Sequence, residues 1–257
     1  KIEELKKAVE IYKDKEWVLS SEHLHARLND VEIRRLKSLL CPLFSEIKII
    51  VYLRNPIEVA VSLWSTVVRA GKPIKRIPSP GTEWDYICNH KRTIELWEEN
   101  FQEKIIPKLY SKRSFFKGNL LEDFLYQIGS KLDASYEIPA NVNQSMSYAG
   151  IRILSNLNEI IPPAKYGCFD PLRGNIEGQI METYKDFPKY HPTEKELYDY
   201  EKYYEDSNKW IKNKYFPDLE FLWESNQKIL ENEDHKLLID KEINATSKLI
   251  SNLLKKN

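Results

Sequence analysis

An apolar run that leads directly into a helix start is the feature of this sequence that most restricts its fold. Residues 47–53 (IKIIVYL) are almost continuously apolar, which is typical of a strand covered on both faces in a parallel sheet. Asn55 is a favourable helix cap, and Pro56 suits the first helical position, where its missing N–H costs no hydrogen bond. The sequence therefore predicts a buried strand over residues 47–53 and a helix over residues 56–69.

Strands and helices are expected to alternate along the first half of the chain. Helical spacing of apolar residues predicts four further helices, and two short apolar runs predict further strands. The helices are expected over residues 1–14, 30–40, 85–101 and 120–128, and the strands over residues 17–21 and 105–110. This alternation indicates an α/β protein with a parallel sheet flanked by helices.

The second half of the chain has a different pattern. Helices are expected over residues 144–160 and within residues 194–257, on either side of an irregular stretch over residues 162–193. We therefore expect a single domain over residues 1–257, with a sheet core in residues 1–130 and a mostly helical extension in residues 131–257.

Composition excludes several classes of protein. The formal net charge of the 257 residues is zero, which disfavours a nucleic-acid binder, because such proteins carry a large positive excess. The three cysteines form no CxxC pair, so neither a zinc site nor a disulfide scaffold is expected. No apolar run is long enough to cross a membrane, so we expect no integral membrane segment in these residues.

The predicted strand-to-helix junction has the residues of a phosphate site. Ligands of open α/β sheets bind beyond the carboxyl ends of the strands, where a helix N-terminus also attracts anions. Arg54 stands at this strand end and offers a fork of donors that fits phosphate oxygens. Ser62 lies seven residues after Asn55, so the two share one face of the predicted helix.

The segment YLRNPIEVAVSLW resembles the 3′-phosphate-binding segment of PAPS-dependent sulfotransferases, with Arg54, Pro56 and Ser62 matching position for position. The segments WVLSSEHL, LWEENFQEKIIPKLY and LLEDFLYQIG resemble the bacterial branch that modifies cell-surface carbohydrates. The resemblance implies a P-loop-NTPase-like parallel sheet and transfer of a sulfuryl group from PAPS to a hydroxyl of a carbohydrate or glycolipid. It also implies that Arg54 and Ser62 hold the 3′-phosphate of PAPS or of its product PAP.

The same resemblance implies a general base at the end of the strand that precedes the arginine segment. Glu22 occupies that place, directly after the strand predicted over residues 17–21. His23 and His25 are the alternatives, because the pKa of histidine lies closer to neutral pH. A metal site is not expected, since these two histidines have no third ligand at a suitable spacing.

One family feature is missing from the sequence. Sulfotransferases bind the 5′-phosphosulfate with a loop near the N-terminus, and none of the eight glycines here stands in such a loop. The chain begins at Lys1, so we expect the first strand and this loop upstream of it. A cytoplasmic bacterial enzyme is expected, with the Golgi lumen as the alternative if the upstream part carries an anchor. A catalytically inactive relative and a kinase-like nucleotide-binding protein are the competing interpretations of function.

Three further features have two interpretations each. Arg173 and Gly174 resemble a late loop that grips the 3′-phosphate, although a plain turn is the simpler interpretation. The basic residues between Lys72 and Arg76 could contact an anion or could be solvated loop charges. The tyrosines from Tyr184 to Tyr204 could stack on sugar rings, but such residues more often pack a helical layer.

Overall fold

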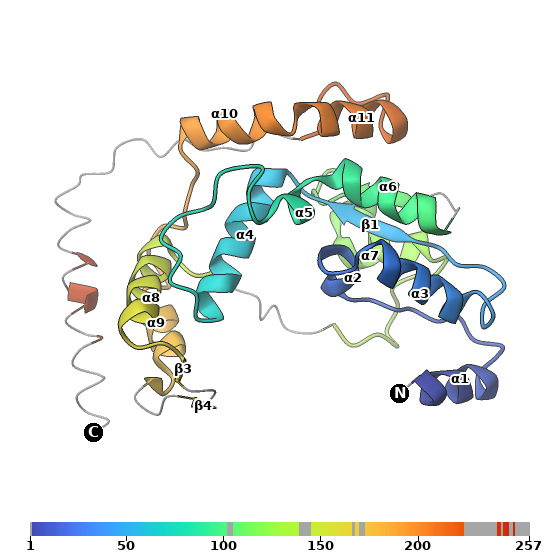
Figure 1. Cartoon of the computed structure of the whole chain (residues 1–257), viewed down its shortest axis with the longest axis horizontal. Helices are drawn as coiled ribbons and strands as arrows, with labels where there is room; N and C mark the ends of the chain where they lie inside the picture. The colour runs from blue at the N-terminus through green and yellow to red at the C-terminus, as the bar shows by residue number, and fades with distance from the viewer. Residues whose placement is uncertain are drawn as a thin grey trace. The chain divides into compact units, whose positions relative to one another are not determined.

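The protein is described by a computed structural model that covers residues 2–101, 105–138, 145–165, 168–169, 173–223, 241–242, 244–246 and 249. The chain divides into two compact units, each made of segments that are separate in the sequence (Figure 1). Unit 1 contains Lys1–Arg54, Glu83–Asp133 and Tyr204–Leu222. Unit 2 contains Asn55–Thr82, Ala134–Tyr203 and Trp223–Asn257.

Unit 1 is built around a two-stranded parallel sheet. Strand β1 (Ile50–Leu53) pairs with β2 (Ile106–Leu109) in a register that sets Leu53 beside Leu109. The strands predicted over residues 47–53 and 105–110 are therefore present, and both are shorter than expected. The prediction of a strand buried on both faces is wrong, because only Leu53 is fully buried while the other three residues of β1 are partly exposed.

Helices surround this sheet, and their ends follow local capping rules. Asn29 and Glu32 form a reciprocal capping box that starts α3 (Asp30–Leu40). Asn119 caps α7 (Leu120–Gln127), and Gly129 ends it with a positive φ of 78°. Both α3 and α11 (Glu205–Tyr215) pack on α6 (His90–Phe101) (Figure 1). The remaining elements of unit 1 are α1 (Ile2–Ile11), α2 (Glu22–Ala26), α5 (Asp85–Cys88) and the 3₁₀ turn η1 (Phe116–Gly118).

Two predictions for unit 1 are corrected. Residues 17–21 form no strand, and Val18 and Leu19 are 53% and 48% exposed. Apolar residues alone cannot make a strand, because a strand needs a hydrogen-bonded neighbour. The helix expected over residues 85–101 is divided at Asn89 into α5 and α6.

The described part of unit 2 is helical and includes a small pair of antiparallel strands. Its core is α4 (Pro56–Arg69), which packs against α8 (Tyr148–Ile160) and α10 (Glu194–Tyr203). Trp64 is fully buried, and its Nε1 donates to the Ile74 carbonyl at 2.8 Å. The stretch expected to be irregular contains α9 (Ile176–Thr183) and the two antiparallel strands β3 (Ala164–Lys165) and β4 (Cys168–Phe169).

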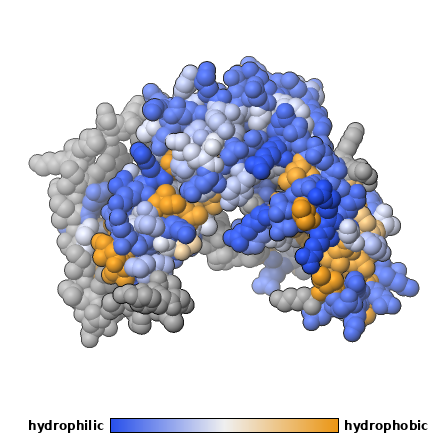
Figure 2. Space-filling model, in the orientation of Figure 1, coloured by the Kyte–Doolittle hydropathy of each residue, from blue (hydrophilic) through white to orange (hydrophobic). Residues whose placement is uncertain are grey.

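The described residues make a mainly helical α/β protein with a small parallel sheet. On the face drawn in Figure 2, hydrophilic residues predominate and hydrophobic residues gather in a few separate patches. No helix in the described ranges is long and apolar enough to cross a membrane. The helices predicted within residues 194–257 include α10 and α11, whereas residues 224–240 and most of those that follow lie outside the described residues.

Candidate functional site

Arg54 and Tyr110 lie next to each other at the carboxyl end of the parallel sheet in unit 1. Arg54 directly follows β1 and Tyr110 directly follows β2, and the Tyr110 N–H donates to the Leu53 carbonyl at 2.7 Å. The guanidinium carbon of Arg54 is 5.7 Å from the centroid of the Tyr110 ring, a cation–π contact. This is the sheet edge at which α/β proteins bind ligands, so the structure places the arginine where the sequence predicted it.

A buried histidine holds the main chain of this arginine. His90 begins α6 and is 2% exposed, and its Nε2 lies 2.6 Å from the Arg54 carbonyl oxygen. A carbonyl only accepts hydrogen bonds, so Nε2 carries the proton and the ring is the Nε2–H tautomer. Burial, together with the positive charge that His25 can carry, lowers the pKa of His90 to about 4, although the hydrogen bond to the Arg54 carbonyl opposes this shift. His90 is therefore neutral at physiological pH.

A second imidazole approaches the first from α2. The rings of His25 and His90 have centroids 6.1 Å apart, and His25 Nε2 lies 3.4 Å from Thr93 Oγ1. Burial lowers the pKa of His25 below its ordinary value. A neutral imidazole can accept a proton, so the site has a group with base chemistry beside the histidine that holds Arg54.

The other two candidate bases are placed differently. Glu22 is the first residue of α2 rather than the end of a strand, because Ser21 caps this helix by accepting from the His23 N–H at 3.2 Å. Glu22 and His23 are both exposed. Within the described part of the chain, only His25 of the three candidates contacts the histidine that holds Arg54.

Ser62 belongs to unit 2 and lies exposed on α4. Asn55 caps the same helix, with its Oδ1 accepting from the Ile57 N–H at 3.3 Å. The helix thus starts and ends where the sequence predicted. The division of the chain falls between Arg54 and Asn55, so the convergence of Arg54 and Ser62 on one phosphate stays a prediction.

His90 and Tyr110 are parts of the site that the sequence reasoning did not single out. Tyr110 could have been found, because it is the last residue of the strand predicted over residues 105–110 and so stands at the same end of the sheet as Arg54. His90 gave no comparable signal, since its partner is a main-chain carbonyl 36 residues away in the sequence.

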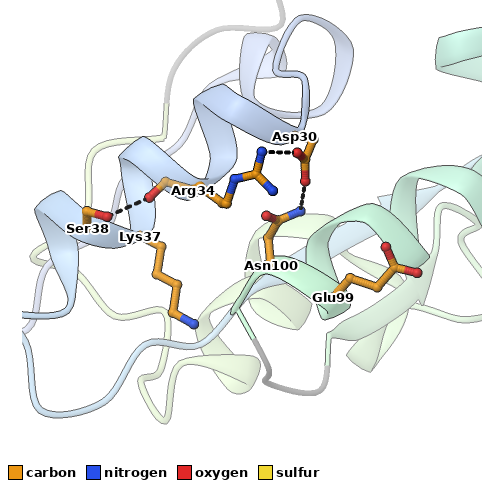
Figure 3. A pocket seen from close by; sticks show the side chains of 6 residues that line it. All are labelled: Asp30, Arg34, Lys37, Ser38, Glu99 and Asn100. Atoms are coloured by element: carbon orange, nitrogen blue, oxygen red, sulfur yellow. Dashed lines mark hydrogen bonds and ion pairs between the residues drawn. The ribbon is translucent and has the colours of Figure 1, made fainter.

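The polar pocket of unit 1 lies away from this sheet edge. It has a volume of about 450 Å³ between α3 and the C-terminal end of α6 (Figure 3). Arg34 is ion-paired with Asp30, and Asn100 donates to the same carboxylate at 3.0 Å. His90 and Asn100 stand ten residues apart on α6, about 15 Å along the helix axis, so the pocket and the sheet edge are separate places.

The structure decides between two interpretations of Arg173. The side chain is buried in unit 2 and donates to the Ile161 carbonyl at 2.5 Å and to Asn158 Oδ1. Asn158 in turn donates to the carbonyls of Val68 and Lys72, at 2.7 and 2.9 Å. Arg173 therefore stabilises the C-terminal end of α8 and, through Asn158, its contact with the C-terminal end of α4. Its side chain does not face solvent, as that of an arginine in a phosphate-binding loop would.

The other ambiguous features also have structural partners. Lys75 pairs with Glu159 at 2.8 Å. Tyr184, Tyr200 and Tyr204 are buried, as expected of packing residues, whereas Tyr198 and Tyr203 are exposed.

Neither a metal centre nor a known relative adds to this description. Among the described residues, no group of three or more His, Cys, Asp or Glu side chains is arranged to hold a metal ion. Cys41 and Cys88 form no disulfide, and burial raises the pKa of Cys88 to about 12. Comparison of the chain with protein-family models, curated proteins and solved structures gave no match.

Proposed function

We propose that this protein is a sulfotransferase that moves a sulfuryl group from PAPS to a hydroxyl of a carbohydrate or glycolipid, on a P-loop-NTPase-like sheet. The observation that carries the proposal is the place of Arg54. Arg54 directly follows a parallel strand at the carboxyl end of the sheet. Its guanidinium lies beside Tyr110, and its main-chain carbonyl is hydrogen-bonded to His90. The segment around it is the one that resembles the 3′-phosphate site of the family. A cytoplasmic bacterial setting is part of the same proposal.

The proposed reaction assigns a role to each residue. Arg54 and Ser62 bind the 3′-phosphate and so fix the donor in line with the acceptor. The acceptor oxygen forms a bond to sulfur while the bond from sulfur to the bridging phosphate oxygen breaks, which releases PAP. The base, Glu22 or one of the nearby histidines, takes the acceptor proton. His25 has the stronger structural support, because it is part of the cluster around Arg54.

Calorimetry with PAP tests the proposal on the full-length protein. Arg54→Ala should weaken binding by about 1.5–3 kcal/mol, the range for a hydrogen bond to a charged group. Arg35→Ala is the matched control, because Arg35 is an exposed arginine of α3. Ser62→Ala should weaken binding by about 1 kcal/mol, and Thr66→Ala, one turn further along α4, should not. Unchanged affinity in Arg54→Ala would remove the assignment.

The same titrations separate the competing functions. Tight binding of PAP without sulfuryl transfer identifies an inactive relative. Binding of ATP with Mg²⁺ in preference to PAP identifies a kinase-like protein.

A further inference from the structure

The polar pocket of unit 1 contains a buried amide whose orientation is fixed by its hydrogen bonds. Asn100 is 7% exposed, and its Nδ2 donates to Asp30 Oδ1 at 3.0 Å and to the Leu96 carbonyl at 2.7 Å. Both protons of the amide nitrogen are therefore used, which assigns the remaining amide atom as the oxygen. Figure 3 shows this oxygen turned away from Asp30, toward the side of the pocket on which Lys37 lies.

This oxygen is an acceptor that lacks a donor. In the described part of the chain, no N–H or O–H is hydrogen-bonded to Asn100 Oδ1. A buried acceptor that has lost its water is unfavourable, so a donor from a ligand would be bound strongly at this point. The pocket therefore presents a preoriented acceptor on its most buried side chain.

The charged side chains around the amide fall into two groups. Arg34 and Asp30 are ion-paired with each other. Lys37 and Glu99, in contrast, form no ion pair with any residue that the structure describes. Lys37 is partly buried and extends from α3 toward α6, whereas Glu99 is exposed on α6 (Figure 3). A cation and an anion that can each take a partner thus line the same pocket.

We infer that this pocket binds a free α-amino acid, a function separate from the proposed sulfuryl transfer. The α-carboxylate pairs with the Lys37 ammonium, and the α-ammonium donates to Asn100 Oδ1 in the field of the Glu99 carboxylate. The volume of about 450 Å³ lies within the range of small-molecule sites.

The balance of charge disfavours simpler ligands. The lining has two acidic and two basic side chains, which are Asp30, Glu99, Arg34 and Lys37. A bare anion such as phosphate would meet the Glu99 carboxylate, and a bare cation would meet the Lys37 ammonium. A quaternary ammonium compound would bring no N–H to Asn100 Oδ1. An α-amino acid carries both charges close together and has the N–H donors that the amide lacks.

Calorimetry with L-glutamine as the probe tests this inference on the full-length protein. Glutamine has a polar, uncharged side chain, which suits a polar lining without net charge. N-acetyl-L-glutamine lacks the α-ammonium, and the α-amide of L-glutamine lacks the α-carboxylate. Each derivative should bind about tenfold more weakly than glutamine, as the loss of one charge-assisted hydrogen bond implies.

Two variants assign the contacts. Lys37→Met keeps the aliphatic stem and removes the ammonium, so it should weaken glutamine binding about tenfold and leave binding of the α-amide unchanged. Glu99→Gln should weaken glutamine binding about threefold and should not weaken binding of N-acetyl-L-glutamine. Lys7→Met removes an exposed lysine of α1 and is the matched control, with a change of less than about twofold.

The outcomes also separate this inference from the proposed function. Absence of glutamine binding, equal binding of glutamine and N-acetyl-L-glutamine, or wild-type glutamine affinity in Lys37→Met would each overturn the inference. A loss of PAP affinity in Lys37→Met would overturn it as well, because the pocket would then belong to the donor site. Glutamine binding in a protein that does not bind PAP would sustain the amino-acid site and refute the proposed function.

Discussion

His90 Nε2 donates a hydrogen bond to the carbonyl oxygen of Arg54 at 2.6 Å, so a buried ring on α6 fixes the end of strand β1. The bond joins α6 to the end of β1. Because the carbonyl belongs to Arg54 itself, the bond also fixes the point at which the Arg54 side chain leaves the backbone. His90 itself is 2% exposed and does not reach solvent. Its role is to position Arg54 rather than to touch a ligand.

Replacement of His90 should separate positioning from simple stability. His90→Phe removes the donor and should cost about 1–3 kcal/mol of unfolding free energy, since a buried carbonyl loses its partner. It should also weaken PAP binding. His90→Gln keeps an N–H donor and should therefore restore part of the unfolding free energy and part of the PAP affinity. Urea unfolding and calorimetry measure the two effects, with exposed His191→Gln as the control. Wild-type PAP affinity in folded His90→Phe would show that the bond is structural only.

The lowered pKa of His90 predicts a pH dependence of stability. The unfolded state binds a proton near pH 6.5, whereas the folded state does so only near pH 4. The contribution of neutral His90 to the unfolding free energy is therefore complete above pH 6.5. It is lost as the pH falls to 4, by about 1.4 kcal/mol per pH unit and ~3 kcal/mol in total. Unfolding free energies of wild type and His90→Gln should converge by this amount between pH 7 and pH 4. A constant difference over that range would contradict the assignment.

Arg173 should act on stability alone. Its buried guanidinium donates to Ile161 and Asn158, so Arg173→Ala should lower the unfolding free energy by about 2–4 kcal/mol. PAP affinity, measured per folded molecule, should stay at the wild-type value. Arg152→Ala removes a more exposed arginine of α8 and serves as the control. A loss of PAP affinity specific to Arg173→Ala would restore the late-loop interpretation.

The candidate bases predict different kinetic results. Removal of the true base should lower sulfuryl transfer from PAPS to the carbohydrate acceptor about 10²–10⁴-fold without changing PAP affinity. The structure favours this result for His25→Asn, because His25 lies beside His90. Glu22→Gln and His23→Asn are the parallel variants, each exposed on the same helix. A loss confined to Glu22→Gln would return the role to the carboxylate.

The parts of the fold that depend on local chemistry were predictable from sequence. The cap of Asn55 and the ring of Pro56 specify the start of α4, and both act within one turn of helix. The prediction of a strand over residues 17–21 was wrong, because apolar character does not indicate whether a neighbouring strand is present to pair with these residues.

Prediction of the site was limited by contacts between distant residues. Arg54 was found because its strand and its chemistry are both visible in the sequence. His90 was not, since its function depends on a carbonyl, which every residue has. Glu22 was favoured as the end of a strand, and the Ser21 cap that instead makes it a helix residue depends on backbone geometry.

The double use of the Asp123 carboxylate makes strand β1 and the loop of residues 110–119, between β2 and α7, one cooperative folding unit. Tyr52 and Phe116 share this acceptor, so neither element can open without leaving a polar group of the other without its partner in the interior. The Phe116 amide should therefore exchange with deuterium as slowly as the amides of the sheet, although it belongs to a surface loop. Tyr52→Phe, a change inside the strand, should accelerate exchange in the loop.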